Sequence, residues 1–334
     1  MKKTILILTL ATFTAVFSGC SKRSKEGSSS KQPKIAVTVD GHKLTWKEMD
    51  KRAESFLNDE VNIKGLTFPE NKREEALEFF RRRAVKIFVF KTLFMAEAKR
   101  QRVQIDDGDR KQGLEKLALT LKKRNQTPEE FFASSPLGEK FIRAEFEDGL
   151  LIDKLLEKMV KDKIKVTDDD MDAVAEEISK QRAEQRKNAI EVRQKLLGGA
   201  DFAEMAQKYS TSPSAAAGGD VGEFERGKCK YGNDVDNAAF KQKVGAIGDI
   251  IEGRDGFLII KVTSRTPAKK ETATTPAVPE TARASIIKIN APSMSGKEIH
   301  NEVMRRKYAK GVDEYYQELR KPAKVECAFT DLVL

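Results

Sequence analysis

One stripe of apolar side chains constrains this chain more than any other feature of its 334 residues. In a segment of helix-forming residues, apolar side chains recur every three or four positions, at Leu77, Phe80, Ala84, Ile87, Phe90 and Phe94. This spacing is typical of a helix with one broad apolar face. Because such a face must be buried, we predict a helical domain in which other elements cover it.

Start signals predict further helices around this stripe. Thr45 is followed by Glu48 at the spacing of a capping box. Thr127 precedes a proline and two glutamates, which favours a helix start. Thr167 precedes three aspartates and opens residues 168–197, a highly charged stretch of helix-forming residues. We therefore expect several helices, of which the last is long.

Strand-like runs lie near both ends of the helical region. Residues 35–39 (IAVTV) read as a strand, and Asp40 with Gly41 predicts a tight hairpin turn after them. A second strand is predicted at residues 324–329. We expect these two terminal strands to pair and to tie the ends of the region together.

The pattern changes in residues 198–263, where glycine turns and short helices surround strand-like runs at 221–224 and 257–262. This indicates a small α+β unit. Residues 264–281 are rich in Pro, Thr, Ala and Lys, which is typical of a flexible linker or loop, and a helix is expected at 297–321. Since the chain exceeds one typical core of roughly 100 to 150 residues, we expect two domains.

Four sequence blocks in this part of the chain occur in a characteristic order. They are LLGGADFAEMAQKYS at 196–210, GGDVGEFERG at 218–227, AAF at 238–240 and GFLIIKV at 256–262. Together the blocks resemble the parvulin family of peptidyl-prolyl isomerases. The preceding helical region resembles more loosely the chaperone part of the SurA and PrsA foldases, in which N- and C-terminal segments pack together.

The resemblance implies an α+β fold. A mainly helical chaperone domain would carry an inserted parvulin-like domain, made of a four-stranded antiparallel sheet and short helices. We place the helical domain at residues 34–180, completed by 297–330. The parvulin-like domain is placed at 185–290 and contains the linker 264–281, and residues 291–334 form a C-terminal helix and strand.

The chemistry of the family sets requirements that this chain does not meet. Rotation about an X-Pro bond has a barrier of about 20 kcal/mol, which an apolar proline pocket and a hydrogen bond to the twisted amide can lower. The resemblance implies two histidines on neighbouring strands and an aspartate or cysteine nearby. Leu258 and Ile286 occupy the histidine positions and Ser212 the third position, so we name no catalytic residue. The chain's two histidines, His42 and His300, lie outside the blocks.

The first strand of the family is missing from its usual place. It should precede the helix at about residues 188–197, but residues 176–193 are charged and helix-forming. The sequence Arg-Ala-Ser-Ile-Ile-Lys-Ile at 283–289 resembles that strand instead. We expect residues 284–289 to be a permuted first strand that pairs antiparallel with the strand at 257–262.

The proline pocket also differs from the family pattern. The resemblance implies a methionine or leucine and two phenylalanines, and these positions fall on Cys229, Val235 and Phe240. A smaller and less aromatic pocket would hold proline loosely. We therefore predict these three residues as substrate-binding and expect weak or absent catalysis.

Two functions follow from the resemblance. In the first, which we favour, the chain is an extracytoplasmic folding factor that binds unfolded or nascent exported polypeptides and whose isomerase activity is weak or lost. Phe79, Phe88 and Phe94 are candidate client contacts, provided that they are not fully buried. In the second, the chain is an active peptidyl-prolyl cis-trans isomerase acting on exported proteins. A structural lipoprotein without clients is a third possibility, supported only by the missing catalytic groups.

The N-terminus predicts export. Two lysines precede an apolar run at residues 5–17, which is too short to span a bilayer, so residues 1–19 are expected to be a signal peptide. The run ends in Ser-Gly before Cys20, which resembles the bacterial lipoprotein signal. We expect lipid on Cys20, a tether at 20–33 and attachment to a bacterial membrane, at the periplasmic face of the outer membrane. The alternative is an ordinary secretory signal with an incidental cysteine.

Composition argues against other classes of partner. The net charge is +10, but the 62 basic residues are interspersed with 52 acidic ones and no nucleic-acid-binding motif accompanies them. We expect no nucleic-acid partner. Prolyl isomerisation needs no metal or cofactor, and we expect none. Cys229 and Cys327 are expected to be free thiols in different domains.

Overall fold

The computed structural model describes residues 34–64, 69–271 and 276–334. The expected signal peptide, the tether and lipidation at Cys20 lie outside these residues. Among the described helices, none combines the length and apolar character that a membrane span requires.

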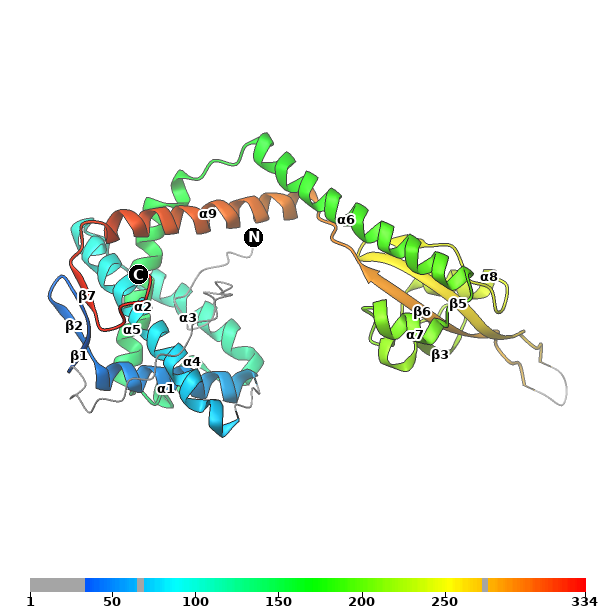
Figure 1. The fold of residues 1–334 in the computed structure, drawn as a ribbon, viewed down its shortest axis with the longest axis horizontal. Helices are drawn as coiled ribbons and strands as arrows, with labels where there is room; N and C mark the ends of the chain where they lie inside the picture. The colour runs from blue at the N-terminus through cyan, green and yellow to red at the C-terminus, as the bar shows by residue number, and fades with distance from the viewer. Residues whose placement is uncertain (1–33, 65–68, 272–275) are drawn as a thin grey trace. The chain divides into compact units, whose positions relative to one another are not determined.

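The chain divides into two compact units (Figure 1). One contains Met1–Ile164 and Arg306–Leu334, and the other contains Lys165–Arg305. The helical domain that we expected at 34–180 extends past this division, because the whole charged helix at 168–197 falls in the second unit. The domain boundaries inferred from the sequence therefore stay a prediction.

The first unit contains a small sheet formed from both ends of the chain. Strands β1 (Ile35–Val39), β2 (His42–Thr45) and β7 (Val325–Cys327) form an antiparallel sheet in the order β2-β1-β7. The red strand β7 lies beside the blue strand β1 in Figure 1. The predicted pairing of the terminal strands is thus confirmed.

Helices make up most of the first unit. They are α1 (Trp46–Lys64), α2 (Arg73–Arg100), α3 (Asp107–Leu121), α4 (Pro128–Ala133), α5 (Glu139–Met159) and the later part of α9 (Gly296–Arg320). Single 3-10 turns lie at Glu70–Lys72, Lys122–Arg124 and Lys161–Lys163. The capping box predicted before α1 is present, since Thr45 N donates to Glu48 Oε2 at 2.9 Å and Glu48 N donates to Thr45 Oγ1 at 3.2 Å.

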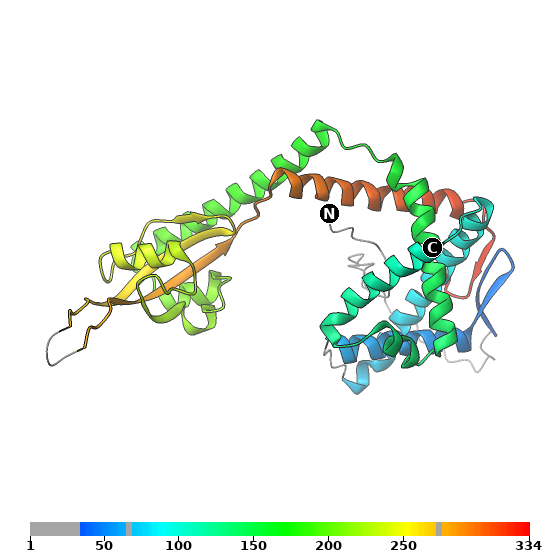
Figure 2. The same ribbon diagram turned by 180° about the vertical axis from the view of Figure 1, so that it is seen from behind.

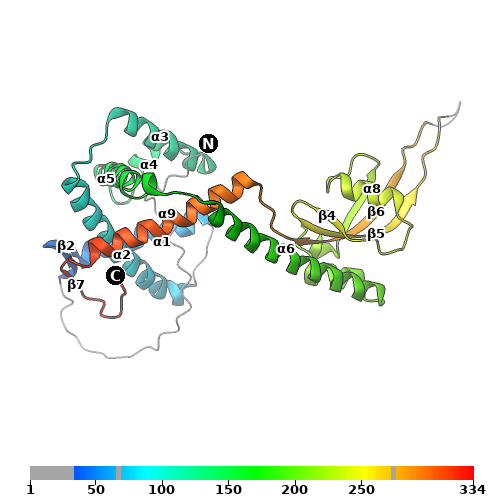
Figure 3. The same cartoon turned by 90° about the horizontal axis from the view of Figure 1, so that it is seen from above.

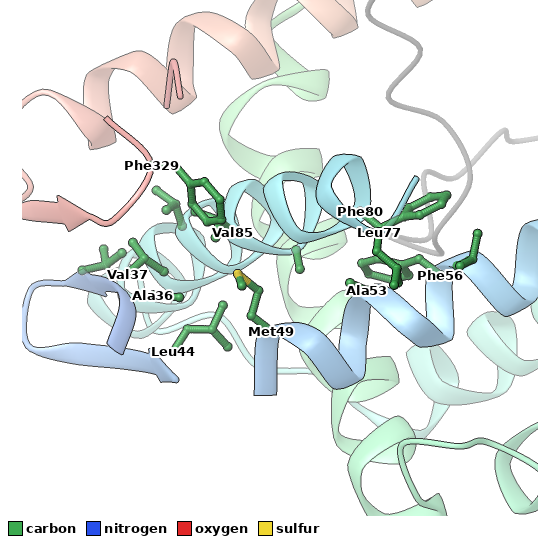
Figure 4. Close-up of a cluster of buried hydrophobic side chains, with 14 of the residues drawn as sticks. Ala36, Val37, Leu44, Met49, Ala53, Phe56, Leu77, Phe80, Val85 and Phe329 are labelled. Carbon is green, nitrogen blue, oxygen red and sulfur yellow. The ribbon is translucent and has the colours of Figure 1, made fainter. Parts of the chain in front are cut away.

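The apolar stripe of α2 forms the core of this unit. Figure 4 shows Leu77 and Phe80 of α2 beside Ala53 and Phe56 of α1, and these side chains belong to one buried cluster. Further along α2, Phe94 is fully buried in a second cluster that includes side chains of α5 and α9. The prediction of a helical face covered by other elements is confirmed.

The second unit is built on a four-stranded sheet. Strands β3 (Asp220–Glu225), β4 (Ile251–Gly253), β5 (Gly256–Thr266) and β6 (Thr281–Asn290) lie in the order β3-β6-β5-β4, and every neighbouring pair is antiparallel. The predicted α+β fold with a four-stranded antiparallel sheet is confirmed.

Helices cover both faces of this sheet. On one face, α6 (Asp168–Leu197) and α7 (Phe202–Tyr209) pack against side chains such as Phe257 and Ile287. On the other face, α8 (Asn233–Lys241) packs against the alternate side chains of the same strands. Figures 2 and 3 show α6 running along the sheet, and in Figure 3 α8 lies on the side opposite to α6.

Strand β6 occupies the position predicted for the permuted strand. Ile286 pairs with Ile260 and Ala284 pairs with Val262, so β6 lies between β5 and β3 inside the sheet. The permutation hypothesis is confirmed. Residues 176–193, where the family strand is absent, are part of helix α6.

The segment expected to be a flexible linker is partly ordered. Within 264–281, β5 extends to Thr266 and β6 begins at Thr281, and Lys269 and Val278 exchange two backbone hydrogen bonds of 2.9 Å. The described part of this segment is therefore a pair of hairpin arms. Because β5 and β6 are antiparallel neighbours, their connection has only to turn back on itself.

Candidate functional site

The two positions where the family carries histidines lie on one face of the central strands. Leu258 lies on β5 and Ile286 on β6, and Ile286 pairs with Ile260, two residues along the strand from Leu258. Such diagonal neighbours are typically about 7–8 Å apart. Ile286 is 1% exposed, whereas Leu258 is half-buried. The fold brings both family positions together, but with apolar side chains.

Ser212, at the third family position, lies in the loop that runs beside strand β6. The chain after α7 runs beside β6, since Thr211 N donates to the carbonyl oxygen of Lys288 at 2.8 Å and Lys288 N donates to Ser210 Oγ at 3.0 Å. Ser212 is buried, and its Oγ lies 3.0 Å from Oγ of Ser214. The hydroxyl group of Ser212 therefore has a partner within its own loop.

Glycine is required where this loop joins β3. Gly219 has φ of 82°, and a Cβ there would lie 2.5 Å from the carbonyl oxygen of Ile286. Its own carbonyl oxygen accepts a 2.9 Å hydrogen bond from Ile286 N. Gly222 on β3 differs, because nothing lies within 4 Å of a Cβ there. Its φ of 77°, at an irregularity of the β3–β6 ladder, is what favours glycine.

The three predicted pocket residues meet on the face covered by α8. Val235 and Phe240 are 0% and 5% exposed, and Cys229 is half-buried against the same cluster. The ring of Phe240 meets the edge of Phe224 at a centroid distance of 5.9 Å, and the guanidinium of Arg226 lies 4.3 Å from its centroid. Their substrate-binding role stays a prediction, and only Cys229 among them offers much surface.

The thiol of Cys229 is poorly suited to covalent chemistry. Burial raises its pKa, and the negative charge of Asp236 raises it further. Cys229 is therefore a neutral thiol near pH 7. Asp236 is itself buried and accepts a 2.8 Å hydrogen bond from Gly227 N, which fixes the loop between β3 and α8. This carboxylate has a structural partner.

Neither of the chain's two histidines lies in the four-stranded sheet of the second unit. His42 lies on β2 in the first unit, and His300 lies on α9; both are exposed. Cys229 and Cys327 are free thiols that belong to different units, as expected. In residues 34–64, 69–271 and 276–334, no three His, Cys, Asp or Glu side chains cluster in a way that could hold a metal ion.

One polar residue of the site was missed by sequence reasoning. Lys288 lies directly opposite Leu258 in the β5–β6 ladder and is half-buried. Side chains alternate between the two faces of a strand, so Lys288 shares a face with Ile286 and Ala284. The signal was present in the period-two pattern of β6, but comparison with the family motif drew attention only to Ile286.

The candidate client contacts on α2 differ in exposure. Phe79 is 63% exposed, Phe88 is half-buried against the core, and Phe94 is 0% exposed. Phe94 therefore fails the condition under which it was proposed. The stripe periodicity identified the apolar face but not the residues that flank it.

Comparison with known proteins agrees with this geometry. A family model described as the PPIC-type PPIase domain, or rotamase, matches residues 156–264. Strand β6 lies outside the matched residues, so the strand in the first-strand position comes from beyond the family match.

The most informative relatives are PrsA foldases. The foldase protein PrsA of Caldanaerobacter subterraneus is 26% identical over 78% of this chain and 82% of its own length. Those of Geobacillus sp. WCH70 and Bacillus subtilis are each 39% identical, but over only 48% and 39% of their own lengths.

A solved structure of PrsA from Lactococcus lactis covers 90% of this chain and 98% of its own, at 14% identity and a TM-score of 0.26. A score this low adds nothing to the assignment. The sequence relatives and the rotamase match support it instead. Residues 156–264 thus match the PPIC-type rotamase family, and the chain as a whole is similar to PrsA foldases.

Proposed function

We propose that the chain is an exported folding factor that binds unfolded polypeptides through its helical unit and whose prolyl-isomerase activity is weak or lost. One observation supports this most directly. Leu258 and Ile286 occupy the two histidine positions on adjacent strands, so neither of these two positions supplies a hydrogen-bond donor to a twisted X-Pro amide. The hydroxyl of Ser212 is engaged with Ser214.

The active-isomerase alternative has one observation in its favour. The apolar face beneath α8 is intact, with Ile260, Val262 and Phe240 packed as one cluster. An apolar surface alone favours the twisted, less polar amide over the planar one. An apolar face of this kind can therefore catalyse isomerisation weakly without histidines. Acceleration of proline-limited refolding distinguishes this alternative from a loss of activity.

Client binding is assigned to the helical unit. Phe79 is the most exposed aromatic candidate on α2, and unfolded chains expose apolar side chains that could pack against it. The PrsA relatives are named as foldases, which agrees with this role.

Two assays on one protein test the proposal. The chain from Ser21 onward keeps every described residue and lacks the expected lipid site. We expect it to suppress aggregation of a chemically unfolded client and to accelerate proline-limited refolding little or not at all. Strong proline-specific acceleration would establish the alternative, and absence of both effects would refute the proposal.

A matched pair of variants locates the client surface. Phe79→Ser should weaken aggregation suppression, because it removes an apolar contact from α2. Val333→Ser changes another exposed apolar residue of the same unit, which is 78% exposed, and should have little effect. Equal loss in both variants would argue against a specific role for Phe79.

Lipid attachment is a separate part of the proposal. We infer that Cys20 anchors the exported protein to a bacterial membrane. The relatives give no support for an outer-membrane location. Incorporation of labelled palmitate into the full chain, compared with Cys20→Ala, tests the anchor, and labelling that survives the substitution would exclude it.

A further inference from the structure

The open end of the parvulin-like face is a row of three side chains across the sheet. Ile251 on β4 pairs with Leu258 on β5, which pairs with Lys288 on β6. All three are half-buried, whereas Ile260 and Ile286, two residues further along the same face, are 0% and 1% exposed. The face is therefore closed beneath α8 and accessible at this row.

Lys288 is unusual for its position on a central strand. Its neighbours on this face, Ala284 and Ile286, are buried and apolar, and lysine is rarely placed in such surroundings unless its charge is paired or reaches water. In the described part of the chain, its amine forms no ion pair or side-chain hydrogen bond. An unpartnered cation thus lies beside the apolar row.

The backbone of Lys288 is held firmly. Its carbonyl oxygen accepts hydrogen bonds from Thr211 N at 2.8 Å and Thr211 Oγ1 at 3.0 Å, and its N–H donates to Ser210 Oγ at 3.0 Å. The strand pairs with β5 on its other side. The amine therefore extends on a flexible stem from a fixed point of the strand, which keeps its reach centred on this end of the face.

We propose that Lys288 gives this site a preference for proline segments in which an acidic residue precedes the proline. The apolar part of the row, Ile251 and Leu258, accommodates the pyrrolidine ring. A Glu or Asp side chain next to the proline reaches the Lys288 amine and forms a charge-assisted hydrogen bond. A basic residue at the same place is repelled. This inference rests on the proposed binding of unfolded polypeptides and adds a substrate class to it.

The test compares three blocked peptides that differ at one residue, Ala-Glu-Pro-Phe, Ala-Gln-Pro-Phe and Ala-Lys-Pro-Phe. Their dissociation constants are measured by NMR chemical-shift titration against the chain from Ser21 onward. At low salt we expect the Glu peptide to bind about threefold to tenfold more tightly than the Gln peptide. The Lys peptide should bind most weakly, and the preference should shrink as salt is added.

Two variants assign the preference to one amine. Lys288→Met removes the charge and keeps an apolar stem, so the Glu and Gln peptides should bind equally. Lys261→Met is the matched control, because Lys261 lies on β5, pairs with Ser285 and projects from the opposite face of the same two strands. It should keep the preference. Lys288→Glu should reverse it in favour of the Lys peptide.

The outcomes separate this inference from the proposed function. Equal binding of the Glu and Gln peptides by the unchanged protein, a preference that survives Lys288→Met, or its loss in Lys261→Met would each overturn the inference. Absence of peptide-induced shifts at Leu258 and Lys288 would do the same. Aggregation suppression by the same sample tests the folding-factor role independently, so either proposal can fail alone.

Discussion

Leu258 and Lys288 form a directly opposed pair across β5 and β6, on the sheet face that corresponds to the parvulin site. The parvulin resemblance implies a histidine at the leucine position, whereas in this chain the polar side chain at this point of the face lies on the neighbouring strand. A lysine amine at the end of a flexible stem cannot reproduce the fixed geometry of two imidazoles. This pair therefore fits a surface that binds proline segments more readily than it catalyses their isomerisation.

Restoring the histidines should restore catalysis. In Leu258→His with Ile286→His, two imidazoles would again lie as diagonal neighbours on adjacent strands. If they contribute one extra hydrogen bond in the transition state, worth about 1.4 kcal/mol, the rate should rise about tenfold. Proline-limited refolding kinetics measure the gain.

The control for this experiment is Leu258→Gln with Ile286→Gln, which adds polar groups without imidazole. It should show no comparable gain. Since Ile286 is 1% exposed, circular dichroism must first establish that both double variants fold. A folded histidine variant no faster than the unchanged protein would mean that other features of the face prevent catalysis.

Replacing Gly219 with alanine should destabilise the junction before β3 more than the same change at Gly199, which serves as the control. Their φ angles are 82° and 94°, but a Cβ at Gly219 would lie 2.5 Å from the carbonyl oxygen of Ile286, whereas nothing lies within 4 Å at Gly199. Gly199→Ala should cost about 1 kcal/mol from backbone strain alone. Gly219→Ala should cost at least about 2 kcal/mol more, because β6 must shift. Chemical denaturation measures both, and equal costs would contradict the steric argument.

The sequence predicted those elements that are specified by local chemistry. The helix at Asp168–Leu197 begins after the capping threonine, Thr167, whose side chain accepts a hydrogen bond from Asp170 N. The permuted strand around Ile286 was predicted because the motif that resembles the family's first strand is local. Each of these patterns lies within a short stretch of sequence, so it can be recognised without knowledge of the tertiary structure.

The features that the sequence did not predict are those set by tertiary packing, such as the exposure of single side chains and contacts between distant segments. Phe79 and Phe94 lie in one helix, yet one is 63% exposed and the other is fully buried, because α5 and α9 cover only part of the helix surface. The hairpin contact of Lys269 with Val278 likewise depends on the antiparallel pairing of β5 and β6. The role of Lys288 follows from its partner Leu258, which lies 30 positions away in the sequence.

The C-terminal aromatic residue should stabilise the terminal sheet. Phe329 is 8% exposed, and its ring lies 5.5 Å from the ring of Trp46 and 5.1 Å from the guanidinium of Arg82. Phe329→Ala should lower the free energy of unfolding by about 3 kcal/mol through lost burial and a residual cavity. Backbone amides of β1 should lose hydrogen-exchange protection, since β7 pairs with β1.

Val333→Ala is the control for this prediction, because Val333 lies close by in sequence and is 78% exposed. It should leave both the stability and the protection of β1 nearly unchanged. If Phe329→Ala also leaves them unchanged, the terminal sheet does not depend on this contact.

Asp153 should make the stability of the helical unit depend on pH. Burial raises the pKa of this α5 carboxyl to about 7, and in the described structure its Oδ2 has no hydrogen-bond partner. Lys116 opposes the shift and Glu157 adds to it, while burial and the charge of Asp153 raise the pKa of Tyr308 on α9 to about 12. The folded state therefore favours the protonated carboxyl.

The sign of the effect follows from proton linkage. The unfolded chain releases this proton near pH 4, whereas the folded chain keeps it until about pH 7. The stabilising contribution is thus fully present below about pH 4 and is lost as pH rises to about 7, by at most about 4 kcal/mol. Asp153→Asn has no proton to lose, so its free energy of unfolding should rise relative to the unchanged protein over this range.

Denaturant unfolding at several values between pH 4 and pH 8 measures the difference between the two proteins, which removes the contribution of all other carboxylates. The exposed Asp162→Asn is the control and should show a nearly constant difference. A difference for Asp153→Asn that is flat between pH 4 and pH 7 would mean that water or a neighbouring cation solvates this carboxylate. In that case the packing of α5 against α9 would be insensitive to its charge.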